Sequence, residues 1–423
     1  MELLELILSD ENLDKAIKQV KSNKGSAGVD KMTTMELEDV MRSEYREKLK
    51  QEIRKREYKP SAVKRVEIPK ADGGLRMLGI PTVIDRMIQQ AINQVLSPIY
   101  EEKFSETSYG FRPKRSAHMA IEKVLEYSNQ NSQWVVDIDL EKFFDKVNHD
   151  KLMQLLSETI KDSDLLSLIR KYLRSGIMIN EEYKEAIIGT PQGGNLSPLL
   201  GNVILDLLDK ELESRGLKFV RYADDCLIFV SSEKSADRVI KSISKFIEEK
   251  LKLKVNMSKS KVARIDKIKY LGFGFYLEEG LHMYKAKPHQ SSITKLKLKI
   301  KEITSRSNAM NMEERLQRLR WLFRGWYNYF KICKIKTICK RIDEHTRFRL
   351  RMCIWKQWKK ISTKYKALKK LGIKAQKAWE WSNTRKGYAR IASSYIMCRA
   401  VTNEKLKRKG FLSLESLILA SNI

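Results

Sequence analysis

Two short apolar segments separated by a pair of acids constrain the fold of this chain more than any other feature. Residues 219–222 (FVRY) and 226–230 (CLIFV) both read as strands, and only Ala223, Asp224 and Asp225 lie between them. So short a connection predicts an antiparallel β-hairpin. Asp is common in turns because it tolerates unusual backbone angles, so the two acids can serve the turn alone. The alternative is that the turn presents two carboxylates for chemistry.

The rest of the first 280 residues mixes strands and helices. Residues 63–80 (VKRVEIPKADGGLRMLGI) alternate and break at 72–74, which predicts a second hairpin with basic residues on both arms. Residues 134–140 (WVVDIDL) predict a short strand that carries acids, and helices are expected after Thr82 and Ser197, each as the cap. From about residue 288 the pattern is helical to the end. The fold class is therefore α+β followed by an all-α region.

The positive charge of the chain is concentrated in its last third. The net charge is +30; residues 281–423 hold 36 Lys and Arg against 8 Asp and Glu, whereas residues 1–280 hold 47 against 45. Six of the seven tryptophans lie in the same last third. Cations that neutralise phosphates, interleaved with aromatic rings that stack on bases, are typical of a nucleic-acid surface. The alternative is a solvated basic face on an ordinary helical domain.

The composition excludes several other classes of protein. The first ten residues (MELLELILSD) carry acids where a secretory signal carries Lys or Arg, and no later apolar run is long enough to span a bilayer. The five cysteines form no CxxC pair, which argues against a structural zinc site or a disulfide framework. We therefore expect a cytoplasmic protein with no membrane partner.

Three acids at the ends of predicted strands suggest a metal site. If the strands that carry Asp139 and the Asp224–Asp225 pair are neighbours in one sheet, three carboxylates converge. Unit charges about 4 Å apart repel by about 4 kcal/mol per pair at an effective dielectric near 20, so such a cluster requires divalent cations. Ligands that are all oxygens suit Mg²⁺. Two such ions can activate a 3′-hydroxyl and stabilise departing pyrophosphate in nucleotidyl transfer.

Seven ordered sequence blocks resemble those of reverse transcriptases. Residues 222–225 (YADD) resemble the YxDD signature and 139–145 (DLEKFFD) the first palm motif. The other blocks are 67–82 (EIPKADGGLRMLGIPT), 108–121 (SYGFRPKRSAHMAI), 190–200 (TPQGGNLSPLL), 256–261 (NMSKSK) and 270–273 (YLGF). The early loop NKGSAGVD, from residue 23, and the basic stretches RGWYNYF and RLRMCIWKQWK are similar to group II intron reverse transcriptases, also called maturases.

This resemblance implies a right-hand polymerase fold. Fingers and a palm with an antiparallel sheet would be followed by an all-α thumb, or maturase, domain. The implied segments are an N-terminal extension at 1–58 with a template-contacting loop, fingers and palm at 59–280, a helical thumb at 281–360 and a basic nucleic-acid-binding segment at 361–423. The paired cysteines and histidines of an endonuclease domain are not found in this sequence.

The resemblance also assigns roles to individual residues. Asp139, Asp224, Asp225 and the backbone carbonyl of Leu140 would hold two Mg²⁺ ions, with Mn²⁺ as a substitute. The incoming nucleotide would contact a set of five residues: Lys70, Arg76, Phe144 as a steric gate under the sugar, Gln192 and Lys259, for which Lys261 is a rival. Template or primer would contact a second set: Asn23, Gly25, Arg112, Arg115, Leu271, Gly272 and Phe273. A surface charge, a core phenylalanine or a packed hairpin is the alternative reading at several of these positions.

The implied function is an RNA-dependent DNA polymerase of a bacterial group II intron. It would copy intron RNA into DNA during retrohoming and bind the same RNA as a splicing maturase. Its partners would be an RNA template, a DNA or RNA primer, the RNA/DNA heteroduplex, the intron RNA and dNTPs. Two alternatives stay open: a free-standing reverse transcriptase of this lineage with a host defence or repair role, and an RNA-binding splicing cofactor with little polymerase activity. The sequence leaves the oligomeric state undetermined.

Overall fold

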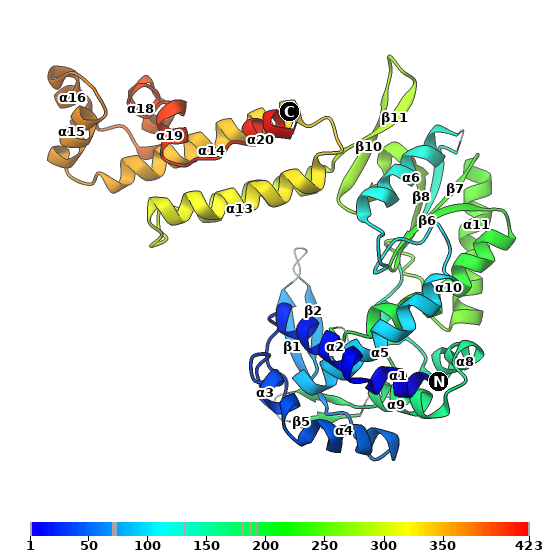
Figure 1. Cartoon of the computed structure of the whole chain (residues 1–423). Coiled ribbons are helices and arrows are strands. Elements are labelled where there is room, and N and C mark those ends of the chain that lie inside the picture. The colour runs from blue at the N-terminus through cyan, green and yellow to red at the C-terminus, as the bar shows by residue number, and fades with distance from the viewer. Residues whose placement is uncertain are drawn as a thin grey trace. The chain divides into compact units, whose positions relative to one another are not determined.

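The computed structural model of the chain describes residues 2–69, 74–130, 132–179, 182–185, 188–190 and 193–421. It divides into two compact units, Met1–Ile265 and Asp266–Ile423 (Figure 1). The division precedes the change in composition at residue 281, because the strands just before that change pack with helices of the second unit. The ring centroid of Phe273, for example, lies 4.9 Å from that of Phe330. The predicted limits at residues 58 and 360 stay predictions.

The first unit contains both helices and strands. Its helices are α1 (Leu3–Leu8), α2 (Asp10–Ser22), α3 (Leu37–Arg42), α4 (Tyr45–Arg54), α5 (Val83–Glu101), α6 (Ala117–Asn129), α7 (Phe143–Lys146), α8 (His149–Thr159), α9 (Ser163–Leu173), α10 (Ser197–Ser214), α11 (Glu233–Phe246) and the π-helical turn η1 (Ile247–Leu251). Its strands are β1 (Val63–Pro69), β2 (Leu75–Ile80), β3 (Trp134–Ile138), β4 (Ile177–Ile179), β5 (Glu182–Lys184), β6 (Lys218–Tyr222), β7 (Asp225–Val230) and β8 (Lys261–Arg264).

The central sheet of the first unit is antiparallel throughout, with the strand order β6-β7-β3-β8. Strands β6 and β7 form the predicted hairpin, and β3 pairs with β7 on one side and β8 on the other. Side chains alternate between the two faces of a strand. Val136, Ile138, Ile228 and Val230 turn to one face and join the main apolar core, and helix α11 packs against β3, β7 and β8.

A second sheet of the first unit has the order β2-β1-β4-β5, in which β1 and β2 form the other predicted hairpin. Helix α5 follows this hairpin directly. Its cap is Thr82, as predicted, since the Thr82 side chain accepts a hydrogen bond from the backbone N–H of Asp85. Helix α10 differs from the expectation by one residue: Ser197 is already helical, and Leu196 caps the helix without a side-chain bond.

The N-terminal helices do not form a core of their own. Helices α1 and α2 pack on α5, and their buried side chains belong to the same apolar cluster as those of α8, α9 and α10. Residues 1–58 are therefore an integral layer of the first unit, which buries far more apolar surface in one core than a segment of that length could bury alone.

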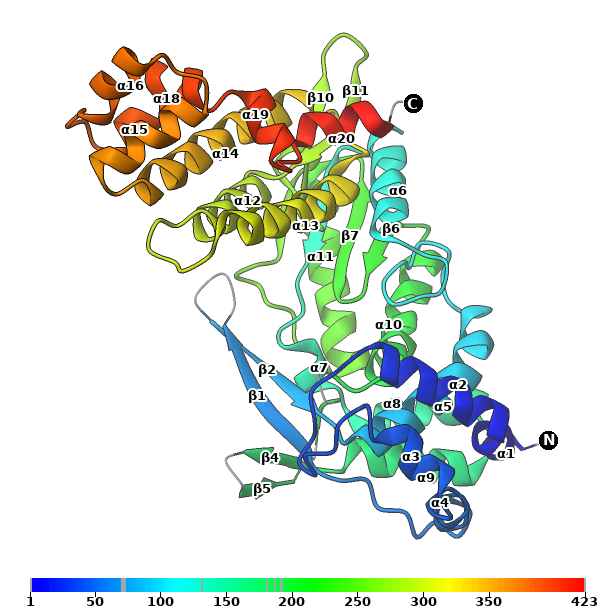
Figure 2. The same cartoon turned by 60° about the vertical axis from the view of Figure 1, so that its left-hand side comes forward.

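The second unit begins with three strands and continues as helices. The strands are β9 (Lys269–Tyr270), β10 (Phe273–Glu278) and β11 (Met283–Pro288), in the order β11-β10-β9, after the short 3₁₀ turn η2 (Ile265–Lys267). The helices are α12 (Gln290–Ile303), α13 (Met312–Phe330), α14 (Lys336–Gln357), α15 (Ile361–Lys370), α16 (Ala375–Ser382), α17 (Tyr388–Ala392), α18 (Tyr395–Ala400), α19 (Asn403–Arg408) and α20 (Leu414–Ser421). Helix α12 packs on α13 and α14 (Figure 2).

None of the helices in the described ranges has both the length and the apolar character needed to cross a bilayer.

Candidate active site

The register of the central sheet brings the two acidic motifs together. Ile138 of β3 stands opposite Cys226 of β7, so the next step of the same register sets Asp139 across from Asp225. Residues directly opposite in an antiparallel pair have Cα atoms about 5 Å apart and point to the same face. Asp224 is the adjoining turn residue. Asp139 and Asp224 are partly buried and Asp225 is exposed, so all three carboxylates are accessible to solvent.

The turn that carries Asp224 has an unusual backbone. Tyr222 pairs with Asp225, so the turn consists of Ala223 and Asp224 alone. Ala223 has a φ of +57°, in the left-handed region that a residue with a Cβ seldom occupies. Gly110 lies directly against it, because a Cβ built on Gly110 would be 2.2 Å from the backbone N of Ala223. The motif at residues 108–111 (SYGF) therefore backs the turn.

Asp139 is held through its backbone by the segment NMSKSK. The Ser260 hydroxyl accepts a bond from the Asp139 N–H at 3.0 Å, and the Asn256 N–H donates to the Asp139 carbonyl at 2.8 Å. Lys259 belongs to this same turn, since its N–H donates to the Asn256 carbonyl. Leu140 and Val255 form an isolated antiparallel β-bridge. Its two backbone hydrogen bonds are made by the residues on either side, Asp139 with Asn256 and Glu141 with Lys254, so neither of them uses the Leu140 carbonyl.

Asp137 is a neighbour of these carboxylates to which the sequence motifs assign no role. It lies on the same face of β3 as Asp139 and stands opposite Lys261 of β8. Burial raises the pKa of Asp137 to about 6, with Lys261 opposing the rise and Asp139 adding to it. The alternation of acids along residues 134–140 placed Asp137 on that face, but its burial depends on how the sheet packs.

Phe144 lies beside the loop that contains the PQGG motif. Its ring is partly buried, 4.9 Å from that of Phe143, and its carbonyl accepts a bond from the Thr190 N–H at 2.7 Å. A Cβ on Gly193 would be 2.4 Å from the carbonyl of Gly79 in β2. The first palm motif and strand β2 are therefore both in contact with described residues of the segment 190–200.

A cavity of about 290 Å³ opens where these segments meet. Arg65, Lys142 and Asp145 line it together with Thr190. Arg65 approaches Asp145 at 3.9 Å, near the outer limit for an ion pair. The sequence pattern predicts basic residues on both arms of the hairpin, but it does not distinguish Arg65 from the others.

Three of the predicted nucleotide contacts are not tested by side-chain geometry. Lys70 and Gln192 lie outside the described residues, and the description of Arg76 is restricted to its place in β2, paired with Ile68 of β1. Their roles stay predictions.

Arg112 has a role inside the protein instead of the predicted template contact. Its side chain is 2% exposed and pairs with Glu101 at 2.8 Å, and it also donates to the carbonyls of Ser105 and Ser108. A guanidinium engaged in this way is not available to a template backbone. Arg115 is paired with Glu106 and stacks over Tyr109, but its side chain keeps 18% exposure, so a template contact stays a prediction.

The loop at residues 23–30 is fastened to helix α5. Asn23 ends helix α2, and its side-chain oxygen accepts a bond from Gln19. Arg86 of α5 donates to the Ser26 carbonyl at 2.7 Å, and a Cβ on Gly25 would be 2.3 Å from the same guanidinium. Template contacts by Asn23 and Gly25 stay predictions.

The predicted primer grip forms a tight turn within the second unit. Leu271 and Gly272 have φ values of +49° and +82°. The Tyr329 hydroxyl donates to the Leu271 carbonyl at 2.8 Å, and the Ser292 hydroxyl donates to the Gly272 carbonyl at 2.8 Å. The ring of Phe273 is fully buried, so it packs the unit and is not available to a primer. Any grip here would use the turn formed by Leu271 and Gly272.

The oxygen donors of Asp139, Asp224 and Asp225 suit a hard divalent cation, although they do not form a complete coordination shell. Within the described ranges, no three His, Cys, Asp or Glu side chains are grouped so as to hold a metal ion by themselves. Carboxylate and carbonyl oxygens are the ligands that Mg²⁺ prefers, and Mg²⁺ commonly takes its remaining ligands from water and substrate phosphates. The donor chemistry therefore fits a metal that binds together with its substrate.

Comparison with protein families assigns both parts of the chain. The model of reverse transcriptase (RNA-dependent DNA polymerase) matches residues 68–275, and the group II intron maturase-specific domain matches residues 293–372. Together they follow the order of the predicted polymerase and maturase regions. The chain belongs to the group II intron reverse transcriptase and maturase family.

Individual relatives agree with this assignment. Protein YkfC of Escherichia coli (strain K12) is 32% identical over 304 residues, which cover 62% of this chain and 80% of that protein. The group II intron-encoded protein LtrA of Lactococcus lactis is 38% identical over 210 residues, which cover 49% of this chain and 34% of LtrA. This reverse transcriptase thus matches most of one relative and about a third of the other.

Among solved structures, a partial Cas6-RT-Cas1–Cas2 complex shares 27% identity with this reverse transcriptase over 59% of this chain and 43% of the other, with a TM-score of 0.38. That likeness is too low to add to the assignment. Membership of the family gives this chain the activity of an RNA-directed DNA polymerase that depends on a divalent metal.

Proposed function

We propose that this reverse transcriptase copies group II intron RNA into DNA during retrohoming and binds the same RNA as a splicing maturase. Asp139, Asp224 and Asp225 are its proposed catalytic residues. The observation that supports this most is the register that sets Asp139 across from Asp225, with Asp224 in the adjoining turn. Strand pairing fixes the backbone positions that carry these carboxylates.

The proposed metal ligands are the three carboxylates and the Leu140 carbonyl, for two Mg²⁺ ions with Mn²⁺ as a substitute. When bound, the ions would supply charge for activating the primer hydroxyl and stabilising pyrophosphate. The residues of this chain hold the donors in place: the Ser260 hydroxyl and the Asn256 N–H fix the backbone of Asp139. Lys259, in the same turn, is the proposed partner of the departing pyrophosphate.

The catalytic assignment is tested by changing Asp224 and Asp225 to Ala together. Primer extension on an RNA template should fall to background, while binding of the RNA/DNA duplex should stay close to that of the wild type. Asp237→Ala, an exposed acid in α11, is the matched control and should extend primers normally. Extension retained by the double variant would refute the assignment.

Phe144 is proposed as the steric gate that rejects ribonucleotides, and Lys70, Arg76 and Gln192 as further contacts to the incoming nucleotide. Phe144 is partly exposed and directly precedes Asp145, which lines the cavity, whereas Phe143 is 3% exposed and belongs to the core. Phe144→Ala should therefore raise ribonucleotide incorporation relative to dNTP incorporation, and Phe143→Leu should not. Equal sugar selectivity in the wild type and the Phe144 variant would remove the gate role.

The proposed nucleic-acid partners are the RNA template, a DNA or RNA primer, their heteroduplex and the intron RNA, bound in the cytoplasm. The basic second unit supports this, because its 36 cations beyond residue 280 can release counterions from phosphates. Duplex affinity should fall by about 10³-fold or more between 50 and 200 mM salt if six or more phosphates are neutralised. A flat salt response would contradict the proposal. Splicing of the flanking intron RNA, measured with and without the protein, separates a maturase from a free-standing enzyme.

A further inference from the structure

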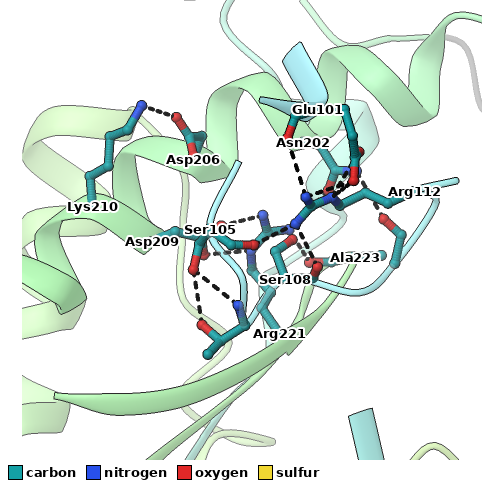
Figure 3. A network of polar contacts seen from close by, with 12 residues as sticks. Glu101, Ser105, Ser108, Arg112, Asn202, Asp206, Asp209, Lys210, Arg221 and Ala223 are labelled. Carbon is teal, nitrogen blue, oxygen red and sulfur yellow. Dashed lines mark hydrogen bonds and ion pairs between the residues drawn. The ribbon is translucent and has the colours of Figure 1, made fainter. Parts of the chain in front are cut away.

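Arg221, the residue before Tyr222 in β6, has a buried side chain that the polymerase chemistry has not used. Its side chain is 0% exposed, and so is that of its partner Asp209 in α10 (Figure 3). The Arg221 Nε and Nη2 atoms donate to the two carboxylate oxygens of Asp209, at 2.7 and 2.5 Å. Burial by itself lowers the pKa of Arg221, but Asp209 keeps that pKa above its ordinary value; burial also raises the pKa of Asp209, against the opposing effect of Arg221.

The remaining nitrogen of the guanidinium reaches the turn. Arg221 Nη1 donates to the carbonyl of Ala223 at 2.9 Å and to the Asn202 side-chain oxygen at 3.0 Å. Ala223 is the turn residue with a φ of +57°, immediately before Asp224. A bond to this carbonyl fixes the orientation of the peptide unit that joins Ala223 to Asp224. The ion pair is therefore connected to the acidic residues through one peptide unit.

Asn202 ties the same turn to the segment behind it. Its side-chain oxygen accepts from Arg221, and its amide nitrogen donates to the Gly110 carbonyl at 2.9 Å. The backbone N–H and carbonyl of Arg221 also bond to Thr107 and Tyr109. The segment before and after Gly110 is in turn braced by Arg112, which binds the Ser105 and Ser108 carbonyls (Figure 3).

Stability alone does not explain a buried ion pair at this place. Removing two charges from water is costly, and an apolar pair of similar volume is often as stable or more stable. What an apolar pair lacks is a donor for the Ala223 carbonyl. Reaction rates are far more sensitive to position than stability is, since a misplacement of about 1 Å can lower a rate about 10²-fold.

We infer that Arg221, clamped by Asp209 and Asn202, is a positioning residue that sets the YADD turn so that Asp224 and Asp225 face Asp139. This rests on the proposed catalytic role of the two acids. Arg221 touches neither substrate nor metal; it acts through the Ala223 carbonyl. Disturbing it should lower the catalytic rate and raise the Mg²⁺ concentration needed for half-maximal rate. Binding of substrate and of the duplex should stay nearly unchanged.

The experiment replaces the ion pair with apolar side chains in the full-length chain, as Arg221→Met with Asp209→Leu. We expect thermal unfolding within a few degrees of the wild type and a fall in kcat for primer extension of about 100-fold. The Mg²⁺ concentration for half-maximal rate should rise, with KM for dNTP and duplex Kd changed by less than about threefold. Lys210→Met, which breaks the Asp206–Lys210 pair in the same helix, is the control and should leave all these values unchanged.

A second variant, Arg221→Lys, keeps a positive charge beside Asp209, but it lacks the planar fork whose three separate nitrogens reach the two Asp209 oxygens and the Ala223 carbonyl. It should also lose rate and require more Mg²⁺, and it decides the question if the double variant does not fold. Wild-type kcat and Mg²⁺ requirement in either folded variant would overturn the inference. If Asp224→Ala with Asp225→Ala abolishes extension while the Arg221 variants are fully active, only the positioning role of Arg221 is refuted. If the double Asp variant is active, the proposed catalytic role of the two acids is refuted.

Discussion

Gly110 offers a direct test of whether the position of the acidic turn controls the rate. The substitution Gly110→Ala adds one methyl group, which would lie 2.2 Å from the Ala223 nitrogen, 2.9 Å from the Tyr222 carbonyl carbon and 3.0 Å from the Ala223 Cα. All three are backbone atoms, so no flexible side chain can move aside. Ordinary contact begins near 3.4 Å, and the turn must therefore retreat by about 1 Å.

Two magnitudes follow from that displacement. Overpacking of this kind costs roughly 1–3 kcal/mol of stability, which a chain of this size tolerates. A shift of about 1 Å in the carboxylates should lower the rate of nucleotide addition by about 100-fold. The loss of rate should thus be much larger than the loss of folded protein can explain.

The assay is single-nucleotide addition to a primer on an RNA template, with the enzyme in excess, alongside thermal unfolding. Gly280→Ala is the control, because a Cβ at that glycine meets nothing within 4 Å. It should leave the rate unchanged. A Gly110→Ala variant that folds and adds nucleotides at the wild-type rate would refute the idea that this contact sets the turn.

Two further predictions concern stability. Arg86 is 8% exposed, and Arg86→Met removes its hydrogen bond to the Ser26 carbonyl. The variant should lose about 1–2 kcal/mol of unfolding free energy and show faster hydrogen exchange in residues 23–30. Unchanged exchange in these residues would contradict the contact. Burial raises the pKa of Asp343 to about 6 from an ordinary 3.8, so the folded state binds this proton more tightly and gains stability as the pH falls through 6. Relative to Asp343→Asn, the wild type should therefore gain about 1 kcal/mol between pH 7 and pH 5 in denaturant titrations, and an equal response of the two proteins would refute the shift.

The local elements of this fold were readable from sequence because they depend on near neighbours. The hairpins predicted at 63–80 and 219–230 are confirmed, as is the short acidic strand that is β3 in the structure. Their alternation of apolar and polar residues has the period of a strand, whatever lies around it. The helical character after residue 288 is also confirmed, because the period of a helix likewise depends on near neighbours in the sequence. The order of the motif blocks also led to the family without any knowledge of the packing.

Tertiary structure decided what the charged side chains near the acidic turn do. Arg112 and Arg221 are both arginines in polymerase-like motifs, and nothing in their sequence neighbours separates them from arginines that bind nucleic acid. In the folded chain each is buried against a carboxylate, Glu101 for one and Asp209 for the other. Burial of a charge depends on which surfaces meet, and a pattern of near neighbours does not contain that information.

The same limit applies to strand register and to the boundary between units. The sequence placed Asp139 and Asp225 at the ends of strands, but a slip of one residue would turn Asp139 to the opposite face, and only the pairing of Ile138 with Cys226 excludes it. The division after Ile265 likewise follows from where β9, β10 and β11 pack, not from the change in charge at residue 281. The sequence by itself determined which elements form and which chemistry they carry. Tertiary contacts determined how those elements align and which of their charges remain free to act.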